Sequence, residues 1–110
     1  MSEKISEKIS EKEICPVINL FSFIGKKWIL LIIKSVSDGC MCFSDIEKTL
    51  VGINPRILST RLKELEKNGF VSSHIKANTK NKTIYCLTEK GMCFSQNIKN
   101  LEEWMKKWEN

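Results

Sequence analysis

The chain of 110 residues carries a net charge of +5, and 42% of its residues are hydrophobic and 28% charged. This length and balance are typical of one globular domain, and the longest apolar run, Trp28 to Ile33, is too short to span a bilayer. The polar amino end also lacks the hydrophobic segment of a secretory signal. We therefore expect a cytoplasmic protein without a membrane partner, whose five cysteines stay reduced and form no disulfide framework.

The positive charge is concentrated in residues 54–82. This segment has seven Lys and Arg residues against two Glu, a local excess of +5, whereas residues 1–13, 14–53 and 83–110 carry −1, +1 and 0. A local basic excess favours binding to a polyanion, and a phosphate backbone is the commonest one.

The first third of the chain predicts an arm followed by two helices. Residues 2–13, SEKISEKISEKE, form a four-residue repeat with too little apolar surface to fold alone. We therefore divide the chain into an arm at 1–13, either helical or disordered, and a domain at 14–110. Pro16 is expected in the first turn of a helix that reaches about Gly25. The apolar segment KKWILLIIKSV then predicts the central buried helix, which an Asp-Gly pair ends.

The middle third predicts two helices joined by a tight turn. Ser44 followed by Glu47 is the pattern of a capping box, so a short helix is expected to begin at Ser44, after a short strand at residues 40–42. Asn54 is expected to cap, and Pro55 to open, the amphipathic helix in NPRILSTRLKELEKNGF. The Asn-Gly pair near the end of this string predicts a left-handed carboxyl cap.

The last third predicts a hairpin and a long helix. The segments FVSSHIKA and KTIYCLT are expected to be strands, and the polar residues 78–82 between them make a basic hairpin tip. Thr88 is expected to cap the last helix. Its apolar residues recur at intervals of four and three, the stripe of a coiled coil, at Phe94, Ile98, Leu101, Met105 and Trp108.

The order of these elements is the plan of a winged helix-turn-helix. In that plan the second helix of the pair lies in the major groove of DNA, and the hairpin tip rests on the flanking backbone. The predicted fold class is therefore α+β, mainly α: a winged helix-turn-helix with a two-stranded β-wing and terminal dimerisation helices.

Three strings carry a more specific resemblance: CPVINLFSFIGKKWILLIIKSV, FSDIEKTLVGINPRILSTRLKELEKNGFV and IYCLTEKG. Over residues 15–108 the chain resembles the HxlR-type family of winged helix-turn-helix transcriptional regulators. The resemblance implies a homodimeric, cytoplasmic repressor or activator that binds a palindromic operator in double-stranded DNA. It places the recognition helix at Pro55 to Lys67 and the wing at Lys76 to Lys82. The dimer interface is expected to contain Phe94, Ile98, Leu101, Trp104, Met105 and Trp108.

The candidate DNA contacts lie on the polar face of the recognition helix and on the wing. Arg56, in the first helical turn, is the best candidate for bidentate contact with guanine. Arg61 lies nearer the buried side, where a phosphate contact and an internal ion pair with a helix carboxylate are both open. The alternative is that these polar side chains form an ordinary solvated face, but the localised positive charge favours contact with DNA. The candidates are Ser44, Asn54, Arg56, Ser59, Thr60, Arg61, Lys63, Lys76, Lys80, Asn81 and Lys82.

Cys15 is a candidate redox sensor. It precedes Pro16 at an expected helix start, where the helix dipole stabilises a thiolate. In several members of the similar family the cysteine at this position senses oxidants or electrophiles; the alternative is a small apolar residue at the dimer interface. Cys40 and Cys42 are expected to be small apolar fillers, or else resolving thiols for Cys15.

Other functions are less well supported by the residues present. The tryptophans either line a small-molecule effector pocket between the terminal helices or pack in the core and the dimer, at Trp28, Trp104 and Trp108. The Cys-x-Cys spacing and single His do not match a compact zinc site, and no acid, base and nucleophile can be paired. We expect no metal, no cofactor and no enzymatic activity. A protein-interaction winged helix without DNA binding is the main alternative, and thiol oxidoreductase chemistry is another.

Overall fold

The computed structural model describes residues 11–76, 80 and 82–109. The greater part of the amino-terminal repeat and the candidate Asn81 lie outside these residues, so the predictions made for them are not tested. The elements follow in the order α2 (Glu11–Ile24), α3 (Ile29–Ser37), β1 (Met41–Cys42), α4 (Phe43–Thr49), α5 (Pro55–Lys67), β2 (Val71–Lys76), β3 (Lys82–Leu87) and α6 (Glu89–Lys107).

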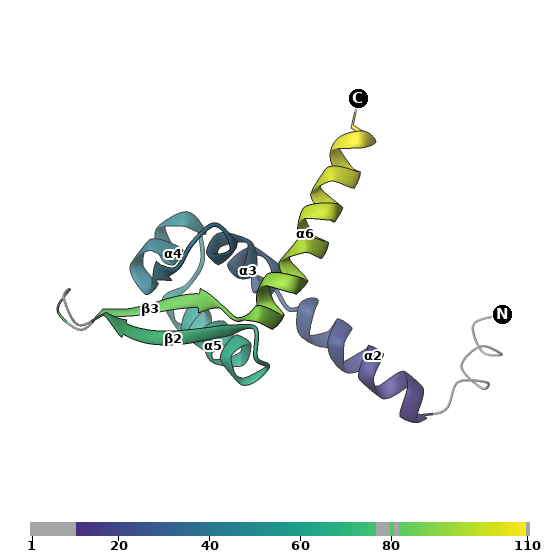
Figure 1. Cartoon of the computed structure of the whole chain (residues 1–110), viewed down its shortest axis with the longest axis horizontal. Helices are drawn as coiled ribbons and strands as arrows, with labels where there is room; N and C mark the ends of the chain where they lie inside the picture. Colours follow the sequence, from purple (N-terminus) through teal and green to yellow (C-terminus); the bar gives the residue numbers. More distant parts are fainter. Residues whose placement is uncertain (1–10, 77–79, 81, 110) are drawn as a thin grey trace.

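The predicted winged helix-turn-helix is confirmed. Helices α4 and α5 form the helix-turn-helix, and β2 and β3 form the hairpin that follows it, as Figure 1 shows. The wing is larger than expected, because β1 adds to β3 and gives a three-stranded antiparallel sheet in the order β1-β3-β2. The short strand predicted at residues 40–42 is therefore part of the same sheet as the hairpin.

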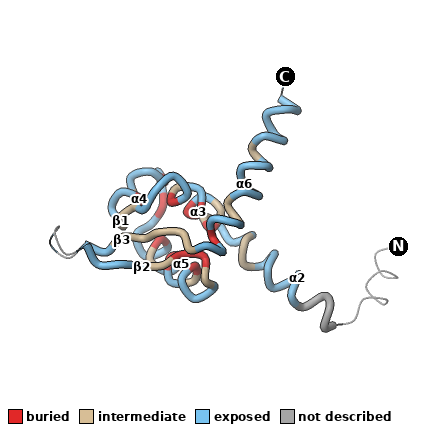
Figure 2. Tube along the Cα trace, in the orientation of Figure 1, coloured by how far each residue is buried: buried red, intermediate tan, exposed pale blue. Residues whose placement is uncertain are grey.

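The core lies where α3, α4 and α5 meet the sheet. Four residues of α3 are buried, as its apolar sequence predicted, and one buried side of α5 faces them (Figure 2). One apolar side chain of α3, Leu31, is 52% exposed, so this helix is not covered all round. The side chains with the least exposure are Ile29, Ile32, Ile33, Ile46, Leu58, Leu62 and Leu65.

Helix α5 begins and ends where its sequence predicted. The Asn54 side chain accepts a hydrogen bond from the backbone N–H of Arg56 at 2.7 Å, and Pro55 is the first helical residue. At the other end Gly69 has φ +81°, and the Phe70 N–H donates to the Leu65 carbonyl at 2.9 Å. This 6→1 bond after a left-handed glycine is the expected carboxyl cap.

Two predicted helix starts were wrong. Helix α2 begins at Glu11, so Pro16 lies inside it and not in its first turn. An exposed helix tolerates this proline at the loss of one backbone hydrogen bond. Helix α4 begins at Phe43, with Cys42 in extended conformation at the N-cap and no side-chain cap, so the capping box predicted from Ser44 does not form. Because β1 ends at Cys42 and α4 begins at the next residue, the N-cap position falls on Cys42 and Ser44 already lies within the helix.

A disulfide bond joins Cys40 and Cys86, which contradicts the expectation that the cysteines stay reduced. The antiparallel register pairs Met41 with Tyr85 and Cys42 with Ile84, and its continuation brings Cys40 opposite Cys86. Their Cα atoms are 4.4 Å apart, within the range for a disulfide. Cys40 is therefore neither a filler nor a free resolving thiol, whereas Cys42 and Cys93 are free.

Helices α2 and α6 project from the body on the side away from the wing tip (Figure 1). Most of their length is exposed in this single chain, as Figure 2 shows. No single described helix is long and apolar enough to cross a membrane, although Pro16–Ile24 and Ile29–Ser37, bent by 74° at their junction, pass that test as a pair.

The apolar stripe of α6 is partly buried in its first half and exposed in its second half. Phe94 and Ile98 pack against the core of their own chain, and the Phe94 and Phe70 rings make a T-shaped pair with their centroids 5.3 Å apart. The second half of the stripe is uncovered, with Leu101, Trp104, Met105 and Trp108 each 56% to 70% exposed. Phe94 and Ile98 therefore serve the core first, which the coiled-coil spacing alone did not indicate.

Candidate nucleic-acid interface

Helix α5 has a buried apolar face, which turns its polar face toward solvent. Leu58, Leu62 and Leu65 are at most 1% exposed, and this packing fixes the rotation of the helix about its axis. Arg56, Thr60 and Lys63 are exposed on the other side, and Ser59 is half-buried between the two faces. The Thr60 hydroxyl donates to the Arg56 carbonyl at 3.0 Å, so it sits against the helix backbone.

Arg61 is held inside the domain. Its Nε–H donates to the Lys27 carbonyl at 2.9 Å, and its Nη1 donates to the Glu64 carboxylate, also at 2.9 Å. The other oxygen of Glu64 accepts from the Lys26 ammonium group. Of the two roles open to Arg61, the structure shows the internal ion pair. Lys26 and Lys27 join this network, so α5 is bonded to the segment between α2 and α3.

Sequence reasoning allowed for a helix carboxylate beside Arg61 but did not name Glu64, and it missed Lys26 as a member of this site. The Arg61–Glu64 pair has the i, i+3 spacing of neighbours on one helix face, which was a usable signal. The contact from Glu64 to Lys26 spans 38 positions in sequence and had no local signal.

The hydrogen bond from Lys26, with that from Arg61, holds the pKa of the Glu64 carboxyl below its usual value of 4.5. A lowered pKa in the folded protein means that the ionised form stabilises the fold above pH 4.5, and that this contribution is lost as the pH falls through the lowered pKa. We expect Glu64→Gln to lower the melting temperature at pH 7, with the difference from wild type shrinking below pH 4.5. Thermal melts between pH 7 and pH 3 measure it.

The matched control is Glu103→Gln, which removes one carboxylate from an exposed position on α6. Its difference from wild type should change much less over the same acid range. If the two variants follow parallel pH profiles, Glu64 has no special role in the fold.

The wing carries its cations at the hairpin tip. Lys76 ends β2 and lies opposite Lys82 at the start of β3 in the strand register. Lys80, in the turn between them, is exposed and has a left-handed backbone with φ +53°. All three are therefore grouped at the end of the sheet farthest from α2 and α6 (Figure 1).

Ser44 and Asn54 lie at the starts of the two helices of the helix-turn-helix. Ser44 is exposed near the start of α4, and its hydroxyl lies 3.3 Å from the Cys42 Sγ atom. Asn54 is exposed, while its side-chain oxygen caps α5. Both side chains are therefore accessible at the amino ends of the two helices of the motif.

Cys15 lies in α2 but not at its start. It is the fifth residue of that helix, whereas the effect of the helix dipole fades beyond the first turn. The dipole argument for its reactivity was therefore wrong, and the prediction that Cys15 is a sensor rests on the family resemblance alone.

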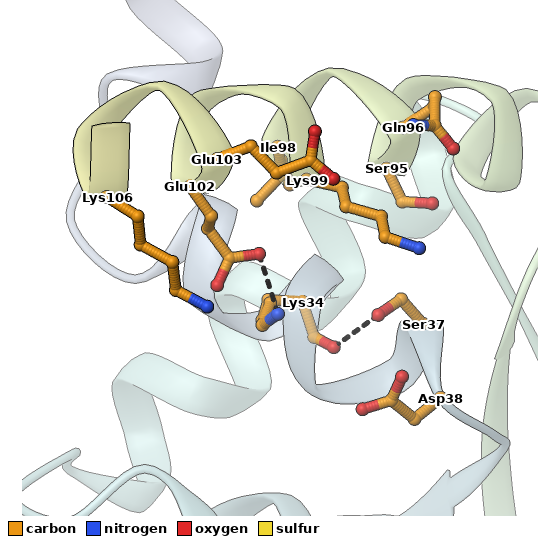
Figure 3. Close-up of a pocket in the computed structure, with 10 residues that line it drawn as sticks. All are labelled: Lys34, Ser37, Asp38, Ser95, Gln96, Ile98, Lys99, Glu102, Glu103 and Lys106. Carbon is orange, nitrogen blue, oxygen red and sulfur yellow. Dashed lines mark hydrogen bonds and ion pairs between the residues drawn. The ribbon is translucent and has the colours of Figure 1, made fainter. Parts of the chain in front are cut away.

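A pocket of about 380 Å³ lies between the end of α3 and one face of α6 (Figure 3). Its walls carry charges of both signs, and Lys34 donates to Glu102 across it at 2.7 Å. The tryptophans suggested for an effector pocket are not among the lining residues. Trp28 packs on the core, and Trp104 and Trp108 are 60% and 70% exposed. The described lining residues are Lys34, Ser37, Asp38, Ser95, Gln96, Ile98, Lys99, Glu102, Glu103 and Lys106.

Comparison with known proteins places this geometry among helix-turn-helix regulators. A family model described as HxlR-like helix-turn-helix matches residues 23–110. The HTH-type transcriptional regulator YodB of Bacillus subtilis (strain 168) is 38% identical over 91 residues, covering 82% of this chain and 81% of YodB.

Solved structures agree with that comparison. The reduced form of B. subtilis YodB superposes with a TM-score of 0.73 at 37% identity, covering 82% of this chain and 88% of that one. Quinone-bound YodB gives 0.72 at 33% identity, with 84% and 98% covered. The redox regulator HypR in its oxidized form gives 0.77 at 28% identity, with 87% and 99% covered.

Proposed function

The chain belongs to the HxlR-like helix-turn-helix family of transcriptional regulators, and from that premise we propose that it binds a palindromic operator as a homodimer. Helix α5 enters the major groove, and the wing tip meets the flanking phosphates. The observation that supports this most is the pairing of an exposed basic stripe on α5 with a cationic hairpin tip. We further propose that it acts in the cytoplasm and has no enzymatic activity.

The contacts divide by position on this surface. Arg56 has an exposed side chain in the first turn of α5 and is proposed to read a guanine. Arg61 is proposed to act mainly by positioning, because its guanidinium group already bonds within the domain. The other candidates, proposed to contact base edges, sugars or phosphates, are Ser44, Asn54, Ser59, Thr60, Lys63, Lys76, Lys80, Asn81 and Lys82.

The dimer is proposed to form through α2 and α6. Both helices leave the same end of the body and expose apolar side chains that a single chain does not cover (Figure 1). These side chains are Val17, Ile18, Leu20 and Phe21 on α2, and Leu101, Trp104, Met105 and Trp108 on α6. Burying them against a second copy would place two recognition helices in one particle, as a palindromic site requires.

Lys80→Ala should weaken binding to all duplexes by a similar factor, because a phosphate contact does not read sequence. The slope of log Kd against log salt should become shallower by about one unit. The left-handed backbone at this position disfavours Lys and Ala alike, so the substitution adds no backbone strain to the hairpin. Fluorescence anisotropy with duplexes selected from a random pool, at a series of salt concentrations, measures both effects. An unchanged slope would mean that the wing tip does not touch DNA.

Arg56→Ala should relax specificity at one base position of the selected site. Loss of a bidentate contact to guanine costs about 1 to 3 kcal/mol at that position and little elsewhere. Selection from a random pool with the variant, beside wild type, shows which position loses its preference. A uniform loss at every position would make Arg56 a phosphate contact instead. A protein that retains no duplex, but captures a protein partner after nuclease treatment, would support the interaction-module alternative.

We propose that the regulator responds to an oxidant or an electrophile through Cys15. Support comes from similar proteins, since one solved YodB structure is described as quinone-bound and HypR as a redox regulator in its oxidized form. Cys15→Ser should then keep duplex binding and lose its response to quinones.

A further inference from the structure

We propose that the Cys40–Cys86 disulfide is a reversible clasp that sets the affinity of the wing for DNA, independently of Cys15. The inference rests on the proposed DNA binding and adds a second redox-sensitive site to it. In the fold, this bond connects the two parts of the motif that are expected to touch DNA.

The clasp joins the helix-turn-helix to the wing. Cys40 comes directly before β1, and β1 runs into α4 through Cys42, the N-cap of that helix. Cys86 lies in β3, the central strand of the sheet, whose first residue is the wing cation Lys82. The bond therefore ties the strand that carries the wing tip to the strand that starts the first helix of the motif.

Without the clasp, the β1 to β3 connection is short. Only two residue pairs, Met41 with Tyr85 and Cys42 with Ile84, form the register between these strands. In contrast, six pairs join β2 to β3, so the hairpin keeps its own ladder in either redox state. A two-residue strand is marginal by itself. Opening the disulfide should therefore loosen the base of the wing and leave the hairpin and the core intact.

The bond is placed where a small thiol can reach it. Cys40 is exposed, and both cysteines border a hollow of about 200 Å³ whose other walls include Val36, Gly39, Leu87 and Met92. In the cytoplasm proposed for this regulator, small thiols reduce accessible disulfides, so a bond of this kind persists only while an oxidant supplies it. An accessible disulfide in such a compartment reports the redox state.

The reaction is thiol–disulfide exchange with a low-molecular-weight thiol. Its thiolate attacks the Cys40 Sγ atom, the bond between the two cysteines breaks, and Cys86 leaves as a thiolate that takes up a proton. A second small thiolate then attacks the mixed disulfide and releases Cys40. Two small thiols become one small disulfide, and the protein gains two thiols. The reverse reaction with that small disulfide closes the clasp.

The closed clasp should favour DNA binding. A wing whose base is fixed to α4 loses less freedom when it meets the backbone, and such preorganisation raises affinity. We expect the reduced protein to bind its selected duplex about threefold to tenfold more weakly, with the same base preferences.

The experiment uses the full chain with Cys15, Cys42 and Cys93 replaced by Ser, so that the two clasp cysteines alone can react. The protein is equilibrated in glutathione buffers of different ratios, alkylated, and scored for the closed bond by mass spectrometry. Duplex affinity and amide hydrogen exchange of β3 are measured at each end of the series. The two matched controls carry either Cys40→Ser or Cys86→Ser in the same background, and neither of them can form the clasp.

The proposal is supported if the bond is closed in oxidising buffer and opens in reducing buffer while the protein stays folded. Opening should weaken duplex binding and speed amide exchange in β3, and the control variants should behave like the reduced protein in every buffer. A bond that is absent, or that opens with no change in affinity or β3 exchange, overturns the clasp. If β3 responds but no duplex binds in either state, the proposed DNA binding fails and the effect of the clasp on the wing stands.

Discussion

Replacing Leu101 and Met105 with Glu should convert the proposed dimer into a monomer. Both side chains are more than half exposed in the single chain, so the folded domain tolerates the change, whereas two carboxylates cannot be buried against a partner without a large desolvation cost. The monomer should bind a full palindromic site at least about a hundredfold more weakly, because the second half-site no longer benefits from effective concentration.

Sedimentation equilibrium and anisotropy titrations with full and half sites test this result. The matched control is Gln96→Glu with Lys99→Gln, which changes the net charge by the same amount on the α6 face that lines the pocket of Figure 3. The control should stay dimeric and keep the preference for a full site. A double Glu variant that still sediments as a dimer would place the interface on another surface.

Arg61→Ala should destabilise the fold more than any other change on the polar side of α5. The guanidinium group makes two hydrogen bonds, to the Lys27 carbonyl and to the Glu64 carboxylate, and its side chain is 19% exposed. Hydrogen bonds that involve a charged group contribute about 1.5 to 3 kcal/mol each, so we expect a loss of about 3 kcal/mol in the free energy of unfolding. Urea denaturation followed by circular dichroism measures it.

Lys63→Ala, on the exposed face of the same helix, is the matched control and should stay within about 0.5 kcal/mol of wild type. Arg61→Lys should recover only part of the loss, since an ammonium group cannot reproduce the fork of donors. If Arg61→Ala keeps wild-type stability but has a shallower salt slope in DNA binding, its main contact is with phosphate.

The Arg61 network connects α5 to the bend between α2 and α3. The Lys26 and Lys27 segment lies at the 74° bend between α2 and α3, next to Trp28, which has a left-handed backbone with φ +83°. Helix α2 is proposed to reach the partner, and Arg61 and Glu64 belong to the recognition helix. The Arg61 and Glu64 side chains therefore bond α5 directly to this bend.

Local sequence determined the elements of this protein. The Asn54 cap, the left-handed Gly69, the hairpin and the Thr88 cap were all predictable, because each depends on residues a few positions apart. The period of Leu58, Leu62 and Leu65 likewise predicted which side of α5 is buried. From these elements and the localised charge, the winged helix-turn-helix and the exposed basic side of α5 followed.

Tertiary structure alone decided what those elements touch. Periodicity marks an apolar face without identifying its partner, so it did not predict that Phe94 and Ile98, expected at a dimer interface, also pack on their own core. The partners of Glu64 and Cys86 lie 38 and 46 positions away, and only the packed fold and the strand register bring them together. The start of α4 was missed for a similar reason, since pairing with β3 extends β1 up to the first residue of that helix.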